Sequence, residues 1–300
     1  LINGLIPHFY EGELTGSVRV CGMNVPEEEI YTVSRKVGSV FQNPRSQFFC
    51  LDTSSELAFG CENLGMPVEQ INERVKYAAE ELEPENLLDR DIFKLSGGEK
   101  QRIACGSVSA MLPDIIVLDE PTSNLDAESI ELLKRILALW KKQNKTIIIA
   151  EHRLYWLKDI CDRAVYLSDG KIQMDIPMRE LTDYSEQKME KLGLRSINAD
   201  FQSQINKSDW SPPSQNEPDT ITLKDYVFAY DVKTILDIRN LQIPRNEVIA
   251  ITGQNGAGKS TLMGMIEGKV KPDSGEIIKG ETVKIDPKSI GVGQYQHDLN

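Results

Sequence analysis

The 300-residue sequence contains no long hydrophobic run. None of its apolar stretches approaches the roughly 20 consecutive residues that a membrane-spanning helix needs, and no segment resembles a secretory signal peptide. We therefore expect neither a transmembrane helix nor a leader. The chain begins at Leu1 rather than at methionine, so we expect it to be a fragment of a longer protein.

Metal-binding cysteine pairs and an excess of positive charge are also lacking. The five cysteines show neither a CxxC pair nor a metal-ligand spacing, so we predict reduced thiols in a cytosolic protein. The sequence has 34 Lys and Arg residues and 46 Asp and Glu residues. The resulting formal net charge of -12 argues against a general nucleic-acid-binding surface. The length is enough for about two domains.

The most informative segment is Leu95 to Asp126, which reads LSGGEKQRIACGSVSAMLPDIIVLDEPTSNLD. Ser96, Gly97 and Gly98 are typical of a tight turn that opens a helix, here expected to run to about Leu112. The start of a helix presents unpaired N–H groups and a partial positive charge, so it suits an anion such as phosphate.

Two carboxylates follow the next predicted element. Ile115 to Leu118 is a short apolar run of the buried-strand type, and Asp119 and Glu120 lie at its end. Ligands bind at the carboxyl ends of strands in open α/β sheets. One of these carboxylates is therefore a candidate Mg²⁺ ligand, through water, and the other a candidate base for an attacking water. An ordinary helix-turn-strand with an acidic loop is the plain alternative.

Two further polar residues follow predicted strands. Gln42 ends the strand in VGSVFQNP, where its amide could reach a metal-bound water and a phosphate, although spacing alone favours a surface turn. Thr146 to Ala150 is predicted to be a buried strand, and His152 follows it closely. A lone histidine in this position is usually structural.

A phosphate loop is predicted near the other end of the chain. Val248 to Thr252 is an apolar strand, and the next nine residues, GQNGAGKST, fit the pattern G-x-x-x-x-G-K-[ST]. Its backbone N–H groups would wrap phosphates, Lys259 would reach the β- and γ-phosphates, and Ser260 would offer a hydroxyl to Mg²⁺. The predicted nucleotide-binding residues of this loop are Gly253, Gln254, Asn255, Gly256, Ala257, Gly258, Lys259, Ser260 and Thr261.

Composition and an internal repeat predict the domain organisation. Residues 188–219 are rich in Ser, Asn, Gln and Pro and read as a linker between a first domain at 1–187 and a second at 220–300. Ile2-Asn3-Gly4 followed by Gly16-Ser17-Val18 matches Ile266-Glu267-Gly268 followed by Gly275-Glu276-Ile277. This repeat predicts two copies of one domain, the first copy's phosphate loop lying before the start of the sequence.

Taken together, these motifs resemble those of the ATP-binding-cassette (ABC) ATPases. LSGGEKQR is similar to their signature, IIVLDE to their Walker B motif, SNLD to their D-loop, FQNP to their Q-loop and GQNGAGKST to their Walker A motif. The resemblance implies tandem P-loop NTPase domains of the α/β class. Each would have a parallel-sheet core, a helical signature subdomain that includes an amphipathic helix at 67–82, and an antiparallel β subdomain.

The same resemblance implies roles for individual residues. Glu120 would be the general base, with Gln42 and His152 as its catalytic neighbours at the γ-phosphate. ATP and Mg²⁺ are the implied cofactors. The metal would be held by Asp119, Ser260, Gln42 and, as the second Q-loop residue, Gln296 in preference to Gln294. Further nucleotide contacts would come from Ser96, Gly97, Gly98, Gln101 and Asp126. The aromatic ring that stacks on adenine would be Tyr230, with Phe228 and Tyr226 as the alternatives.

Partners are implied as well. ABC ATPase domains pair head to tail, so the loop at 253–261 would face Ser96 to Gly98 across one nucleotide. The 300-residue piece alone is then expected to bind ATP weakly and to hydrolyse it negligibly.

The segment FQNPRSQFF, the ENLGMP helix region and the tandem layout resemble those of the ATPase subunits of energy-coupling-factor importers, which take up vitamins or metal ions such as cobalt or nickel. Such ATPases lie at the cytoplasmic face of the membrane with a transmembrane coupling protein and a substrate-binding membrane subunit. Phe48 and Phe49 are candidates for that docking surface, or for the core. A sugar or peptide importer and a soluble tandem ABC protein acting on ribosomes are the alternatives.

Overall fold

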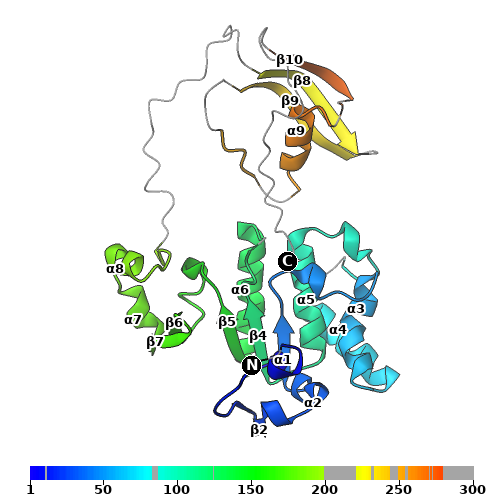
Figure 1. Ribbon diagram of the computed structural model, residues 1–300. Coiled ribbons are helices and arrows are strands. Elements are labelled where there is room, and N and C mark those ends of the chain that lie inside the picture. The colour runs from blue at the N-terminus through cyan, green and yellow to red at the C-terminus, as the bar shows by residue number, and fades with distance from the viewer. Residues whose placement is uncertain are drawn as a thin grey trace. The chain divides into compact units, whose positions relative to one another are not determined.

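The computed structural model describes two compact units, Leu1–Phe201 and Gln202–Asn300, and each is treated separately below (Figure 1). The residues described are 1–10, 12–82, 87–123, 125–198, 221–230, 233–243, 249–253, 256–269, 271 and 273–279.

The first unit is built on a parallel sheet of β3 (Val37–Val40), β4 (Ile115–Asp119) and β5 (Thr146–Ala150), with β4 in the centre. The strands β4 and β5 are rich in β-branched and other apolar residues, whereas β3 has Gly38 and Ser39 between its two valines. The register aligns Val40 with Leu118 and Asp119 with Ala150. Because the strands are parallel and in step, their carboxyl ends meet at one edge of the sheet.

The expectation that β5 is fully buried is wrong. Exposed and partly buried residues alternate along it, and Ile148 is 36% exposed. The reason is its position: among the described residues β5 pairs with β4 on one side only, so it is an edge strand.

Two helices flank this sheet and bring the motifs to it. The helix α5 (Gly97–Ala110) is buried along almost its whole length and runs into the turn before β4. The helix α6 (Ala127–Lys142) connects β4 to β5 and buries an apolar stripe at helical spacing, which confirms the predicted pattern. The buried members of that stripe include Ile130, Leu133, Leu137 and Trp140.

A helical subdomain packs around α5. It consists of α3 (Thr53–Asn63) and α4 (Val68–Glu81), and the three helices contact one another in pairs (Figure 1). The side chain of Asp52 caps α3 by accepting a hydrogen bond from the N–H of Ser55 at 2.9 Å. This arrangement matches the predicted helical signature subdomain.

The remaining elements of the first unit are short. They are α1 (Leu5–His8), β1 (Arg19–Val20), β2 (Met23–Asn24), α2 (Ile30–Ser34), β6 (Arg163–Ser168), β7 (Lys171–Pro177), α7 (Met178–Thr182), α8 (Glu186–Lys191), and the 3-10 turns Val25–Glu27, Pro44–Ser46, Ile92–Lys94 and Leu154–Trp156.

The first unit extends further along the chain than the composition suggests. The prediction that a linker begins at residue 188 is wrong, because the helix α8 runs across that position. Met189 and Ile197 are only 2% and 1% exposed, and both pack into the main hydrophobic core of this unit. Two buried apolar side chains among polar neighbours are enough to dock the segment. Residues 199–219 of the predicted linker lie outside the described part of the chain.

The second unit contains an antiparallel sheet in the order β10-β8-β9 and one helix. Its elements are β8 (Ile221–Tyr230), β9 (Lys233–Ile243), β10 (Ser274–Lys279) and α9 (Lys259–Ile266). Leu223 and Tyr226 from β8 pack with Leu262 and Met265 of α9 in one core. The strand expected at 248–252 is not seen at Ile249–Thr252, because a strand needs a hydrogen-bonded neighbour and no described residue pairs with these.

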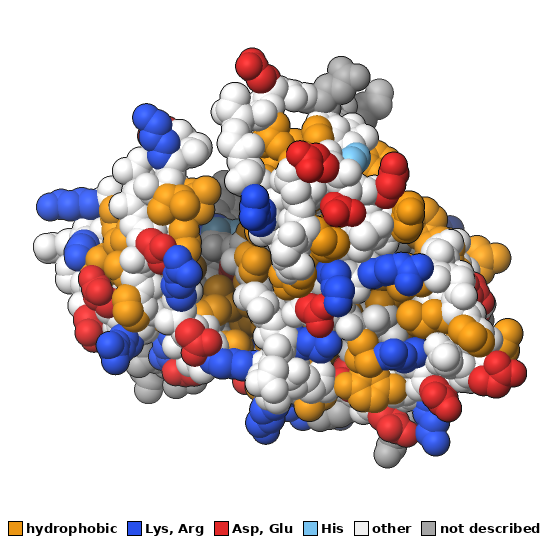
Figure 2. All heavy atoms as spheres, turned by 90° about the horizontal axis from the view of Figure 1, so that it is seen from below, with side chains coloured by type: hydrophobic (Ala, Val, Ile, Leu, Met, Phe, Trp, Pro, Cys, Tyr) orange, Lys and Arg blue, Asp and Glu red, His pale blue; other side chains and the backbone are white. Residues whose placement is uncertain are grey.

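Surface and covalent features agree with the composition. Within the described ranges, no helix combines the length and the apolar character needed to cross a bilayer. The five cysteines, all of which are described, are free thiols, and burial raises the pKa of the Cys105 thiol to about 12. Figure 2 shows one face on which basic and acidic side chains are intermingled rather than gathered by sign.

The extended boundary predicts that Ile197→Ala destabilises the first unit. Removing a fully buried isoleucine side chain should lower its free energy of unfolding by about 2–5 kcal/mol, because a cavity remains in the core. Denaturant unfolding followed by the fluorescence of the buried Trp140 and Trp156 measures this. The exposed Glu190→Ala is the control and should change stability by less than about 0.5 kcal/mol. Equal stability of both variants would contradict the packing of this segment.

Candidate functional site

Three predicted residues meet at the carboxyl edge of the parallel sheet. Gln42 follows β3, Glu120 follows β4 and His152 follows β5. The Nε2 of Gln42 donates a hydrogen bond to Oε2 of Glu120 at 2.9 Å, and Nδ1 of His152 lies 3.5 Å from Oε1 of Glu120. Residues that are far apart in the sequence thus surround one carboxylate. A carboxylate flanked by an amide and an imidazole can accept a proton while its neighbours hold an oxygen-rich ligand.

The backbone of Glu120 is held in an uncommon conformation. Its φ of 39° lies in the left-handed region, and its N–H donates to the carbonyl oxygen of Ala150 at 2.8 Å. Such conformations persist only where the surrounding structure imposes them, and they are frequent at functional sites. The side chains of Glu120 and His152 are 35% and 41% exposed, so a ligand can reach both.

Asp119 is exposed as the last residue of β4, next to the candidate base. A carboxylate at this point can serve as an oxygen ligand for Mg²⁺. The described residues hold no group of three or more His, Cys, Asp or Glu side chains placed to bind a metal ion alone. Water and phosphate oxygens would therefore complete the coordination, which is the usual arrangement for Mg²⁺ with a nucleotide.

A group that the sequence interpretation missed lies directly behind this edge. The carboxylate of Glu151 accepts hydrogen bonds from the N–H groups of His152 and Arg153 and from the hydroxyl of Thr122. Arg153 in turn donates from Nη1 to the carbonyl oxygen of Thr122 at 3.1 Å. The position of Glu151 beside His152 is visible in the sequence, but the contact with Thr122 is formed only by the fold.

The signature turn forms a well-capped helix start. The hydroxyl of Ser96 accepts from the N–H of Glu99, and the Glu99 carboxylate accepts from the N–H of Ser96, which is a capping box. Arg90 adds an ion pair to Glu99 at 2.7 Å. Burial alone would raise the pKa of Glu99, but the hydrogen bonds from Ser96 and Arg90 outweigh it and hold that pKa below its usual value. The spacing S-x-x-E could have revealed this cap.

Gly98 is required by close packing at the same turn. A Cβ on Gly98 would lie 2.2 Å from Oγ of Ser129 and 3.1 Å from its Cβ. The start of α5 therefore touches the first turn of α6, and the absence of a side chain permits it.

Gln101 and Asp126, the two other residues of this segment predicted to contact the nucleotide, lie at different places in the fold. Gln101 is 4% exposed within α5, and its contact with a nucleotide stays a prediction. Asp126 is the N-cap of α6 and accepts from the N–H of Ser129 at 2.9 Å. Its contact with a nucleotide stays a prediction.

The predicted phosphate loop precedes α9, which begins at Lys259 as expected. Gly256 and Gly258 have left-handed φ values of 80° and 88°, and a Cβ on Gly258 would lie 2.7 Å from Cδ2 of Leu236. Nζ of Lys259 donates to the carbonyl oxygen of Gly253 at 2.7 Å, which folds the lysine over the loop.

These features fit a phosphate group. Among the described residues no side chain caps the start of α9, so its first-turn N–H groups can serve a phosphate, and Lys259 adds a positive charge. Ser260 is exposed beside them. Gln254 and Asn255 lie outside the described residues.

The structure describes only some of the residues predicted for the adenine-stacking ring and the second Q-loop. Tyr226 is fully buried and Phe228 is 8% exposed, so both belong to the core and neither can stack on adenine. Burial also raises the pKa of the Tyr226 hydroxyl. The side chain of Tyr230 is not described, and Gln294 and Gln296 lie outside the described residues.

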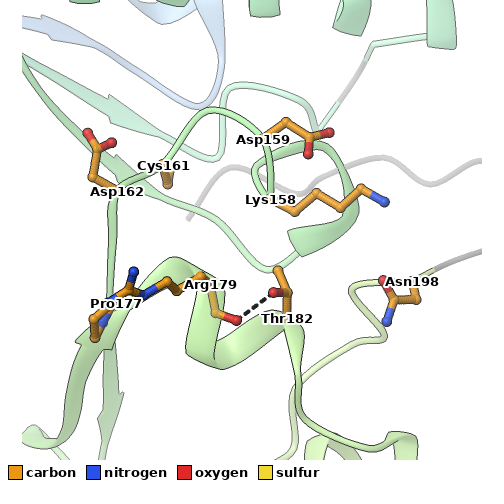
Figure 3. Close-up of a pocket in the computed structure, with 8 residues that line it drawn as sticks. All are labelled: Lys158, Asp159, Cys161, Asp162, Pro177, Arg179, Thr182 and Asn198. Atoms are coloured by element: carbon orange, nitrogen blue, oxygen red, sulfur yellow. Dashed lines mark hydrogen bonds between the residues drawn. The ribbon is translucent and has the colours of Figure 1, made fainter.

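A pocket of about 570 Å³ in the first unit is separate from this edge. Figure 3 shows it between the segment after Trp156 and α7, where the Thr182 hydroxyl donates to the Arg179 carbonyl oxygen. Its lining residues are Lys158, Asp159, Cys161, Asp162, Pro177, Arg179, Thr182 and Asn198, and none is a predicted site residue.

Comparisons with known proteins agree with this geometry. The family model described as ABC transporter matches residues 3–123 and 236–298. A Treponema denticola protein named as an ABC transporter ATP-binding protein is 44% identical over 278 residues, which are 92% of this chain and 57% of that protein. A Methanosarcina acetivorans protein of the same description is 34% identical and aligns with 92% of this chain and 52% of that protein. The chain thus spans about half the length of the curated relatives it matches.

A solved structure adds to these relatives. The protein cbiO1 of Clostridium perfringens, described as part of the ABC transporter complex cbiONQ, superposes with a TM-score of 0.55 at 27% identity. The match covers 65% of this chain and 76% of that chain.

The packing at the signature turn predicts that Gly98→Ala is destabilising. The added methyl group collides with Ser129, so the free energy of unfolding of the first unit should fall by about 1–3 kcal/mol. Adding Ser129→Ala should recover part of the loss, because it removes the oxygen nearest to the new methyl group. Denaturant unfolding measures both effects. Gly12→Ala is the control, since nothing lies within 4 Å of a Cβ there, and a double variant no more stable than Gly98→Ala would contradict the collision.

Proposed function

The chain belongs to the ABC transporter family, and on that premise we propose that it is the ATP-binding and ATP-hydrolysing part of a membrane importer. The observation that carries the proposal is the convergence of Gln42 and His152 on Glu120 at the ends of three parallel strands. A merely structural acidic turn would not need two polar partners from separate strands around a solvent-accessible carboxylate.

The proposed chemistry is transfer of a phosphoryl group to water. Bound Mg-ATP supplies that group and the metal. Glu120 accepts the proton of the attacking water, Gln42 orients the water and the metal, and His152 contacts the γ-phosphate. Asp119 holds Mg²⁺ from the end of β4.

The second unit would provide the phosphate loop of a further site. Lys259 and the first-turn N–H groups of α9 would hold phosphate oxygens, and Ser260 would be a Mg²⁺ ligand. Tyr230 and Gln296 complete the proposal as the adenine platform and the second Q-loop residue.

A duplicated organisation with head-to-tail pairing of the two ATPase domains is part of the proposal. The family model matches two separate ranges of the chain. Gly4 and Gly268, which occupy corresponding places in the internal repeat, have left-handed φ values of 79° and 80°.

The importer is proposed to be of the energy-coupling-factor type, taking up a vitamin or a metal ion such as cobalt or nickel. Its likeness to cbiO1, a part of an ABC transporter complex, supports this class. The partners would be a transmembrane coupling protein and a substrate-binding membrane subunit, with the ATPase at the cytoplasmic face of the membrane.

The structure offers a candidate surface for the coupling protein. Phe48 packs into the core, whereas Phe49 is 74% exposed and stacks on Phe59 with ring centroids 4.9 Å apart. Leu51 and Phe93 are also exposed, and the N–H of Ile92 donates to the carbonyl oxygen of Leu51, which brings their two segments together. An apolar surface of this kind close to the Q-loop suits the apolar side of a membrane protein's cytoplasmic helix.

Glu120→Gln tests the assignment of the general base. The amide cannot accept the proton, so ATP turnover by the full-length gene product should fall at least about 100-fold. ATP binding should persist, and ATP should be trapped in a closed dimer. Steady-state phosphate release and retention of labelled ATP measure the two effects. Glu128→Gln, an exposed change in the first turn of α6, should stay within about twofold; wild-type turnover in Glu120→Gln would refute the role.

Phe49→Ser combined with Leu51→Ser tests the docking surface. Loss of the apolar contact should reduce the fraction of the full-length protein that sediments with membranes by roughly tenfold, while basal turnover is retained. Sedimentation of membranes followed by immunodetection measures it. Phe9→Ser changes another exposed phenylalanine and should have no effect. Undiminished membrane binding in the double variant would show that the partner docks elsewhere.

A further inference from the structure

We infer that Glu151 is a positioning residue, which fixes His152 against Glu120 and ties together the two loops that carry them. This inference rests on the proposed function, because it concerns the same site. It gives a role to a buried charged group that the proposed chemistry leaves unused.

The surroundings of Glu151 are unusual for an acidic residue. Its side chain is 1% exposed, although it stands at the mouth of a solvent-accessible site. Removing a carboxylate from water costs free energy unless hydrogen bonds replace the lost hydration. The position is therefore kept by specific contacts rather than by burial itself.

Those contacts reach two separate loops. Oε1 of Glu151 accepts from the N–H of His152 at 2.9 Å and from the N–H of Arg153 at 3.0 Å. Oε2 accepts from the hydroxyl of the fully buried Thr122 at 2.5 Å. The first two bonds shape the turn after β5, and the third joins it to the loop after β4.

A second bond doubles the link between the loops. The guanidinium of Arg153 donates to the carbonyl oxygen of Thr122, so Thr122 is held by both its hydroxyl and its backbone. Thr122 lies two residues after Glu120, whose own N–H is bonded to Ala150. Glu120 is thus connected to the end of β5 through its own N–H and to the turn after β5 through Thr122.

The consequence is a fixed place for the imidazole. Nδ1 of His152 lies 3.5 Å from Oε1 of Glu151 and 3.5 Å from Oε1 of Glu120. Because Glu151 sets the backbone from which His152 extends, it determines how that ring faces Glu120. A misplacement of about 1 Å in such a constellation can lower turnover by two orders of magnitude.

Another buried carboxylate provides a matched control. Glu56 is 2% exposed and accepts from the N–H groups of two consecutive residues, Phe49 and Cys50, at 2.9 Å each. It has the same chemistry as Glu151 but lies in α3, and neither of these bonds goes to Gln42, Glu120 or His152. Glu56→Gln therefore reports the purely structural cost of neutralising such a group.

The test compares Glu151→Gln, Thr122→Val and Thr122→Ser with Glu56→Gln in the full-length gene product. Glu151→Gln should lower kcat roughly ten- to hundredfold while KM for ATP changes less than about threefold, because it moves the catalytic groups and not the phosphate loop. Thr122→Val should act in the same direction, and Thr122→Ser, which keeps the hydroxyl, should restore turnover to within about twofold of wild type. The double change Glu151→Gln/Thr122→Val should cost no more than Glu151→Gln alone. Glu56→Gln should keep kcat.

Hydrogen exchange provides a readout that does not depend on turnover. In Glu151→Gln the amides of residues 150–154 should exchange at least about tenfold faster than in wild type and in Glu56→Gln. The inference is overturned if these amides keep their protection, or if kcat falls no further in Glu151→Gln than in Glu56→Gln. Absence of ATP turnover in the wild-type protein would instead defeat the proposed function, and exchange at 150–154 would still decide whether Glu151 orders this turn.

Discussion

Parallel backbone pairing of β3, β4 and β5 is the constraint on which the site depends. One polar residue follows the end of each strand, and the register brings Gln42 and His152 to Glu120. A slip of one residue would turn these side chains toward the opposite face of the sheet. The apolar residues of the strands thus set the geometry of the polar ones.

Helix packing ties the signature turn to this sheet. The helix α5 is buried on nearly all sides, so its direction is set by the core rather than by solvent. Its capped start touches α6 at Gly98 and Ser129, and α6 starts just after the loop that carries Glu120. A displacement of the turn at Ser96 to Gly98 should therefore reach the loop that carries Glu120, since packed interiors transmit strain.

Much of this could be predicted from local signals. The glycine turn, the apolar run of β4, the stripe of α6 and the phosphate-loop pattern are short-range features, and the structure contains each element close to where it is predicted. The predictions that failed concern how deeply a segment is buried by the elements around it. The predictions of a fully buried β5 and of a linker from residue 188 both failed, because burial depends on which elements pack around a residue.

The sequence by itself determined the α/β class of the fold and the order in which the glycine-rich and acidic motifs occur. The tertiary structure decided which of those residues share a site and what supports them. Glu151 and Thr122 are separated by 28 intervening positions in the chain, yet they form one hydrogen bond behind Glu120 and His152. Spacing along the chain specifies elements, whereas contacts between them follow from the register of the sheet and the packing of its helices.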